Sequence, residues 1–185
     1  MIPVTVWGLN QPTEDQKFVT DLRRSIVPGY LLVSANKTET FTVSMRLMTQ
    51  VQDIILKNNK NPNVQVIILD SKDLESTDFD LFKSACTNLA YFSFYSSKTY
   101  VIFCDLTRTN LTDEQQGLIE ISDKINRDLR RLVIHWPGRC YYEDLGQVVN
   151  SQDWLDQETL TQAGQEKLAK AVTRILLGTP CEVFI

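Results

Sequence analysis

The chain offers few residues that could perform acid–base or nucleophilic chemistry. It has a single histidine, His135, which follows a short apolar stretch and precedes Trp136. A hydrolase built on this histidine would need a serine within about 3 Å of it, and Ser71 and Ser151 are the candidates. A lone histidine beside a tryptophan and a proline is more typical of a structural residue than of a base. An esterase with such a rearranged site is therefore the weakest of the alternatives that we consider.

The cysteines do not form a recognisable site. The chain has four of them, and they are widely and irregularly spaced: Cys86, Cys104, Cys140 and Cys181. No pair has the close spacing typical of structural zinc ligands or of redox motifs. The pattern favours buried thiols in a reducing compartment. We expect a cytoplasmic protein without a bound metal or other cofactor.

Basic side chains gather in two groups that could contact phosphate groups. The first group is carried by the first and last predicted helices and comprises Lys17, Arg23, Arg24, Lys167, Lys170 and Arg174. The second group lies on a helix in the later half of the chain and comprises Lys124, Arg127, Arg130 and Arg131. Several cations within reach of one backbone are what phosphate recognition requires. Nearby aromatic residues, Tyr141, Tyr142 and Trp154, could stack on unpaired bases.

The overall charge limits this interpretation. The formal net charge of −4 argues against a chain that binds nucleic acid over its whole surface, but it leaves local basic patches possible. Lysine and arginine on outer helix faces are normally solvated, and Asp123 and Asp128 can partly neutralise the second group. RNA binding is therefore a hypothesis about particular surfaces.

The elements that must position these residues alternate between strands and helices. Strands are predicted at residues 2–7, 30–33, 64–69, 100–104 and 132–134, and helices after Thr13 and at residues 43–57, 79–94, 112–129 and 160–177. This alternation predicts a three-layer, doubly wound α/β sandwich with a mostly parallel sheet of five strands. We expect residues 1–185 to form one domain, with binding sites at the carboxyl ends of the strands. No apolar run is long enough for a membrane span.

The last predicted helix has a well-defined pattern. Thr159 is the expected N-cap, and apolar residues recur at spacings of three and four up to Leu176, after which Gly178 ends the helix. Gly164 lies in the first turns, where glycine costs about 1 kcal/mol relative to alanine. We therefore expect Gly164 to allow the close approach of a neighbouring strand or loop.

The phrase from Asp156 to Gly164 resembles the final block of the SGNH (GDSL-like) hydrolases, which reads Asp-x-x-His-Leu-Thr-x-x-Gly before a terminal helix. Asp156 matches, but Thr159 stands where the family has its catalytic histidine. The family's first strand ends in Gly-Asp-Ser, and the corresponding stretch here is Gly8-Leu9-Asn10. In place of the family's Gly-x-Asn-Asp, the segment from Ser71 to Leu74 retains only Asp73. The helical phrase around Asn126 is also typical of the family.

The resemblance implies the fold of these hydrolases without their usual reaction. Asparagine at position 10 cannot act as the nucleophile, and threonine at position 159 cannot act as a base near neutral pH. Some SGNH-like domains are non-catalytic binding modules. The leading hypothesis is a non-catalytic, cytoplasmic RNA-binding module that uses Lys17, Arg23, Arg24, Arg130, Arg131, Lys167, Lys170 and Arg174.

The second hypothesis is a protein–protein scaffold that binds no nucleic acid. It would use residues 136–156 or the apolar tail at residues 183–185. Such a tail can be captured by a peptide-binding partner, or it can fold against its own domain. Neither hypothesis requires association with a membrane.

Overall fold

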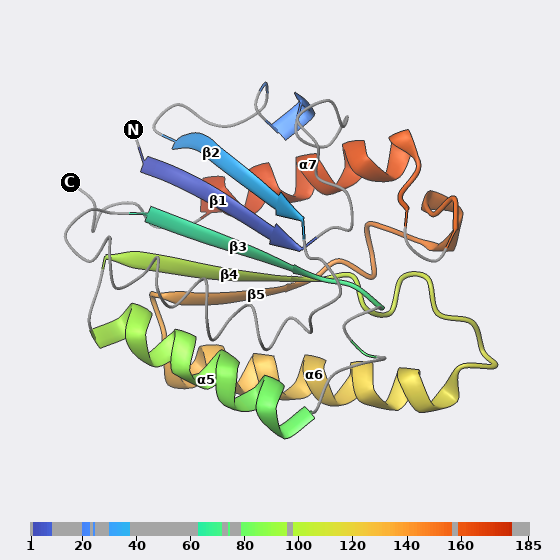
Figure 1. The fold of residues 1–185 in the computed structure, drawn as a ribbon, viewed down its shortest axis with the longest axis horizontal. Coiled ribbons are helices and arrows are strands. Elements are labelled where there is room, and N and C mark those ends of the chain that lie inside the picture. The colour runs from blue at the N-terminus through green and yellow to red at the C-terminus, as the bar shows by residue number, and fades with distance from the viewer. Residues whose placement is uncertain are drawn as a thin grey trace.

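The protein is built around one parallel sheet, seen in a computed structural model that describes residues 2–8, 20–22, 24, 30–37, 63–71, 74, 79–95, 98–156 and 159–178. The strand order is β2-β1-β3-β4-β5, and each neighbouring pair is parallel (Figure 1). The strands are β1 (Ile2–Gly8), β2 (Tyr30–Lys37), β3 (Asn63–Leu69), β4 (Thr99–Asp105) and β5 (Cys140–Asp144). The predicted parallel sheet of five strands is confirmed.

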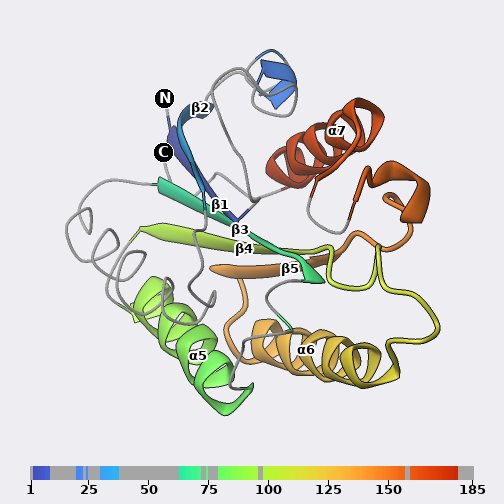
Figure 2. The ribbon, with the colours of Figure 1, turned by 45° about the vertical axis from the view of Figure 1, so that its right-hand side comes forward.

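Helices cover both faces of this sheet. Helices α5 (Phe79–Tyr95) and α6 (Gln116–His135) lie on one face, and α7 (Gln162–Gly178) lies on the other (Figure 2). Residues 20–22 and 24 are helical, and Leu22 belongs to the same apolar cluster as Leu168 of α7. The predicted first helix therefore lies on the α7 face in the part that the structure describes. The remainder of that helix and the predicted helix at 43–57 lie outside the described residues.

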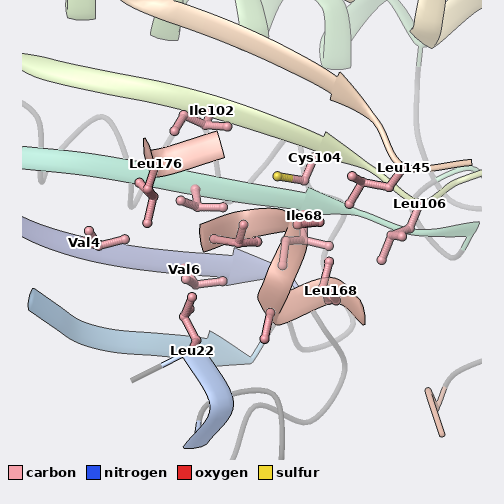
Figure 3. Close-up of a cluster of buried hydrophobic side chains, with 14 of the residues drawn as sticks. Val4, Val6, Leu22, Ile68, Ile102, Cys104, Leu106, Leu145, Leu168 and Leu176 are labelled. Carbon is pink, nitrogen blue, oxygen red and sulfur yellow. The ribbon is translucent and has the colours of Figure 1, made fainter. Parts of the chain in front are cut away.

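The central strands are apolar on both sides because helices cover both faces. β3 directs Val66 and Ile68 toward the α7 face, and it directs Ile67 and Leu69 toward α5 and α6. The same alternation in β4 divides the interior into two clusters, and Figure 3 shows the one beneath α7. A polar row also crosses the sheet: Trp7 donates to Gln65, Gln65 to Asn63, and Asn63 to Thr99, over distances of 2.7, 3.0 and 2.9 Å.

Several predicted boundaries are wrong in the later half of the chain. The helix predicted at residues 112–129 begins at Gln116, four residues later than predicted. Residues 132–134 are not a strand, because α6 continues to His135 and the fifth strand is Cys140–Asp144. Leu132 continues the buried stripe formed by Ile125 and Leu129, so helical spacing prevails over the short apolar run. Gly138, which has a φ of 83°, lies in the turn that separates α6 from β5.

The last helix begins later than predicted. α7 starts at Gln162, and the hydroxyl of Thr161 accepts the backbone N–H of Gly164 at 3.0 Å. Thr161 is therefore the N-cap, whereas Thr159 was expected. Leu160 instead pairs with Trp154 in an antiparallel bridge. Within the described residues, no helix is long and apolar enough to cross a lipid bilayer.

Candidate functional site

The carboxyl ends of the strands meet at one edge of the sheet, where this fold class collects functional groups. β1 reaches this edge at Gly8, which has a φ of 112°. A Cβ atom at position 8 would lie 2.1 Å from the backbone oxygen of Ile68, so only glycine allows β1 and β3 to approach here. Asn10, where the resemblance implies a nucleophile, lies outside the described residues.

The segment before α7 forms a closed loop at this edge. The backbone N–H of Leu155 donates to the carbonyl of Thr159, and the N–H of Thr159 donates to the Asp156 carboxylate, both at 2.8 Å. The indole of Trp154 donates to the hydroxyl of Thr109 at 3.0 Å, which ties this loop to the segment after β4. The structure thus places Asp156 and Thr159 together, with Thr159 half-buried. Where the resemblance implies a carboxylate that orients a histidine, Asp156 accepts a backbone N–H.

Close packing between this loop and α7 depends on Gly164, as the sequence predicted. A Cβ atom at position 164 would lie 2.5 Å from the carbonyl oxygen of Asp153. Asp153 itself is only 5% exposed. Its carboxylate accepts the backbone N–H of Asn150 at 3.0 Å and the Lys167 ammonium at 2.9 Å.

These contacts decide the protonation of Asp153. Burial acts to raise the pKa of this carboxyl, but the hydrogen bond from Asn150 and the ion pair with Lys167 outweigh burial. The pKa of Asp153 is therefore lowered from its ordinary value. Lys167, a predicted RNA contact, is held by the protein's own interior carboxylate.

A second buried carboxylate, Asp105, ends β4. It accepts the backbone N–H of Thr107 at 2.8 Å, the hydroxyl of Thr107 at 2.5 Å and the phenol of Tyr142 at 2.5 Å. The Thr107 hydroxyl also bonds that of Ser122 on α6 at 2.6 Å. Burial raises the pKa of Asp105, and the hydrogen bonds from Thr107 and Tyr142 offset that rise only in part. Burial also raises the pKa of Tyr142, and the charge of Asp105 adds to this effect.

This network extends to one of the predicted RNA contacts. Asn126 donates to the Tyr142 hydroxyl at 2.7 Å and to Asp144 at 3.1 Å. Arg130 donates to Asn126 at 2.9 Å, lies 3.7 Å from the Asp144 carboxylate, and is positioned over the Tyr142 ring. Arg130 is thus engaged in the protein's own polar network. Neither Asp105 nor this network was identified from the sequence, although an aspartate that ends a buried strand was an available signal.

The other predicted basic residues are dispersed over two faces. Arg24, Lys170 and Arg174 are exposed on the α7 side, and Lys170 pairs with Glu166 one turn away at 3.1 Å. Arg131 is exposed on α6, on the opposite side of the sheet. Lys17 and Arg23 lie outside the described residues. The structure therefore separates the two basic groups by the thickness of the sheet.

The rearranged esterase site is not assembled. Ser71 follows β3 and Ser151 follows β5, so both lie at the carboxyl edge of the sheet. His135 ends α6 five residues before β5 begins, which puts it at the opposite edge (Figure 1). A five-residue strand spans about 13 Å, well beyond the reach of a hydrogen bond.

The cysteines behave as interior residues. Cys86, Cys104 and Cys140 are buried free thiols, and Cys181 lies outside the described residues. Burial raises the pKa of all three, that of Cys140 to about 12, so their thiolate forms are scarce at neutral pH. Among the described residues, no cluster of three His, Cys, Asp or Glu side chains could hold a metal ion.

Comparison with known proteins identifies the fold. No protein-family model matches the chain, and no curated protein matches it significantly. Solved structures do match, and they show that the chain has an SGNH-hydrolase-like α/β fold. A lipolytic protein of the G-D-S-L family from Veillonella parvula superposes with a TM-score of 0.69 at 9% identity, over 96% of this chain and 99% of that one.

Two further structures share the architecture. An active-site mutant of a family two carbohydrate esterase from Clostridium thermocellum gives a TM-score of 0.60 at 13% identity, over 96% of this chain and 64% of that one. The N-terminal part of a Bacteroides fragilis protein, which contains a phosphatase domain, gives 0.58 at 12% identity, over 95% and 50%. At these identities the likeness establishes the fold alone.

Proposed function

We propose that this chain is a non-catalytic SGNH-like domain that binds RNA in the cytoplasm through surface basic residues. The observation that carries the non-catalytic half of the proposal is the loop around Thr159. This residue stands where the resemblance to the SGNH hydrolases implies a histidine, and its backbone N–H donates to the Asp156 carboxylate. A threonine hydroxyl does not accept a proton near neutral pH, so Thr159 cannot replace a histidine as the general base. Asn10 would likewise lack the hydroxyl that acyl transfer requires.

The RNA-binding half rests on a resemblance and on unpaired charge. In size, fold pattern and missing triad, the chain resembles the C-terminal domain of the germ-plasm protein Oskar, which binds RNA through surface basic residues. On the α7 face, Arg174 is exposed and has no ion-pair partner among the described residues. Arg24 is exposed on the same side, on the segment that packs through Leu22.

We define the α7 patch as Arg24, Lys170 and Arg174, to which Lys17 and Arg23 would add. Lys170 has only an exposed pair with Glu166, which is worth little and leaves its charge available to phosphate. Lys167 contributes mainly to the stability of the fold, through its ion pair with Asp153. Arg130 and Arg131 would form a separate contact on the opposite face, reached only by an RNA that passes around an edge of the sheet.

The test is charge reversal on the α7 patch, measured as affinity for a 20-nucleotide single-stranded RNA. The double variant Lys170→Glu/Arg174→Glu is expected to weaken binding at least tenfold and to reduce the salt dependence of binding. The matched control, Lys98→Glu/Arg108→Glu, makes the same change in net charge away from α7 and is expected to bind like the wild type. Thermal denaturation checks that both variants fold.

Two results would count against the proposal. Equal affinity in the wild type and the α7 variant would exclude the α7 patch as the RNA surface. A wild type without salt-sensitive RNA binding would exclude the RNA function and favour the alternative, a protein scaffold. The acidic net charge of the chain favours the protein-scaffold alternative.

A further inference from the structure

A groove between α5 and α6 has no part in the RNA proposal. It encloses about 500 Å³, within the range of roughly 300–1,000 Å³ usual for ligand pockets. Both views show these two helices side by side on the face of the sheet away from α7 (Figures 1 and 2). Its apolar lining comes from both helices and consists of Phe82, Cys86, Ile125, Leu129 and Leu132. The groove therefore offers an apolar floor that reaches the protein core.

Exposed aromatic residues continue this apolar surface at one end. Trp136 lines the groove and packs edge-on against Tyr91 and Phe94, with ring centroids 5.8 and 5.5 Å apart. Tyr91 is 48% exposed and Phe94 is 38% exposed. Ile134, two residues before Trp136, is 75% exposed. Of the large hydrophobic residues that are exposed in the described part of the chain, three thus lie at the C-terminal ends of α5 and α6.

The charges along the groove are not balanced. Lys83 and Asp128 face each other at 3.9 Å and largely compensate. Arg131 also lines the groove, is exposed, and has no ion-pair partner among the described residues. The guanidinium of Arg131 is therefore available to pair with an anionic group of a ligand. The imidazole of His135 also lines the groove.

We propose that this groove binds a short acidic segment of a partner protein, which inserts a large apolar side chain and pairs a neighbouring carboxylate with Arg131. Tryptophan, tyrosine and arginine around a desolvated pocket are the composition of interface hot spots. A carboxylate forms a bidentate pair with a guanidinium, so Arg131 would fix the register of the segment.

A peptide fits these observations better than a nucleotide does. Tracking an RNA backbone requires several unpaired cations, and Arg131 is the one cation lining the groove that has no ion-pair partner among the described residues. The floor consists of aliphatic, phenylalanine and cysteine side chains, which offer no hydrogen bonds to the edge of a base. The proposal is independent of RNA binding on the α7 face.

The first variant blocks the groove without altering any charge. Thr87 is exposed, lines the groove, and donates its hydroxyl only to the carbonyl of Lys83 one turn earlier, at 2.9 Å. In Thr87→Trp, the indole would occupy the groove. The hydrogen bond that is lost leaves no buried donor without a partner. The second variant, Arg131→Glu, reverses the unpaired charge. Its matched control is Arg127→Glu, one turn earlier on the exposed face of α6 and outside the groove.

The probes are two displayed libraries of ten-residue peptides, each with a central Phe, Leu or Trp. One library has Asp and Glu at the flanking positions, and the other has Lys and Arg. We expect the wild type and Arg127→Glu to enrich the acidic library, and Thr87→Trp to enrich neither library. Arg131→Glu is expected to lose at least tenfold in affinity for the selected acidic peptides and to shift its preference toward the basic library.

Other outcomes would overturn the proposal. Enrichment that survives Thr87→Trp would place the binding outside the groove, and equal enrichment of both libraries would remove the role of Arg131. If Thr87→Trp abolished binding of the 20-nucleotide RNA while no peptide was selected, the groove would be a nucleotide site. Because Thr87→Trp leaves the α7 patch intact, failure of the peptide proposal and failure of the RNA proposal are distinguishable.

Discussion

Asp153 and Asp105 are buried carboxylates near the carboxyl edge of the sheet, one beneath each helical layer, and their pKa values shift in opposite directions. Asp153, 5% exposed, meets an ammonium group from α7, and its pKa is lowered. Asp105, 4% exposed, meets hydroxyl groups from Thr107 and Tyr142, and its pKa is raised. Burial opposes ionisation at both positions, so the partner decides the outcome. Both carboxylates are thus satisfied by the protein's own donors.

The same contrast separates the basic residues on each face. Lys167 and Arg130 are engaged by Asp153 and by Asp144 with Asn126, so both contribute to the fold. Arg174 and Arg131 have no ion-pair partner among the described residues. Each face therefore has at least one basic side chain engaged by the fold and at least one without an ion-pair partner among the described residues. Charge alone does not distinguish the two kinds.

Among the substitutions that test this comparison, Gly164→Ala is expected to have the largest effect on stability. The new Cβ would lie 2.5 Å from the Asp153 carbonyl oxygen, so α7 or the loop before it must move, and the pair with Lys167 moves with it. We expect the free energy of unfolding to fall by about 2–3 kcal/mol, since overpacking against a backbone outweighs the helix propensity gained. Chemical denaturation measures this loss.

The control for this substitution is Gly117→Ala, near the start of α6. A Cβ at position 117 would have no neighbour within 4 Å, so the variant is expected to gain up to about 1 kcal/mol. Equal stabilities for the two variants would mean that the contact between α7 and the loop is not tight.

Much of the fold could be predicted from the sequence because its central strands are covered on both sides. Short apolar runs at residues 64–69 and 100–104 predicted β3 and β4 to within one residue at each end. β5 was missed because it is an edge strand with half-buried tyrosines and exposed acidic residues. The apolar run at residues 132–134 lies on a helix whose stripe continues from Leu129. Three consecutive apolar residues are too few to distinguish a short strand from part of a helix by periodicity.

The candidate site was less predictable, because its contacts join distant residues. The expected close approach at Gly164 is confirmed, although Gly117 of α6 shows that a glycine in a helix does not by itself indicate crowding. Tyr142 and Asp105 are 37 positions apart, and no local pattern links them. The sequence likewise treated Lys167 and Arg174 as equivalent, although only Lys167 has a buried partner.

The next largest effect is expected from Lys167→Met, which leaves Asp153 without its cation. The unfolding free energy should fall by about 1–3 kcal/mol at pH 7, because a hydrogen bond to a buried charged group is lost. The pKa of Asp153 is lowered in the folded state, so its contribution is present above pH about 4 and disappears as the pH falls through the folded pKa. The deficit of the variant should therefore shrink below pH 4, as measured by urea denaturation.

Lys170→Met provides the matched control on the same helix. Its pair with Glu166 is exposed, so the expected change is below about 0.5 kcal/mol at any pH. A deficit in Lys167→Met that stays constant between pH 7 and pH 3 would show that the ion pair with Asp153 does not stabilise the fold.

The smallest effect is expected from Tyr142→Phe, which removes one of the donors to Asp105. We expect a loss of about 1 kcal/mol at neutral pH, the typical net value of one hydrogen bond, because Thr107 still donates to the carboxylate. The hydrogen bond from Tyr142 favours the ionised form, so its removal should raise the pKa of Asp105 further. Carboxyl NMR titration would show the midpoint of Asp105 above about 4 in the wild type and higher still in the variant.

The pH dependence separates Asp105 from Asp153. A carboxyl whose pKa is raised on folding stabilises the protein below its unfolded pKa, and this contribution is lost as the pH rises through the folded value. The contribution of Asp105 to the unfolding free energy of the wild type should therefore fall as the pH rises above about 4. The substitution Asp105→Asn should remove this pH dependence. In Asp105→Asn, the cost of Tyr142→Phe should no longer vary with pH. If that cost varied as it does in the wild-type background, the titrating group that Tyr142 contacts would not be Asp105.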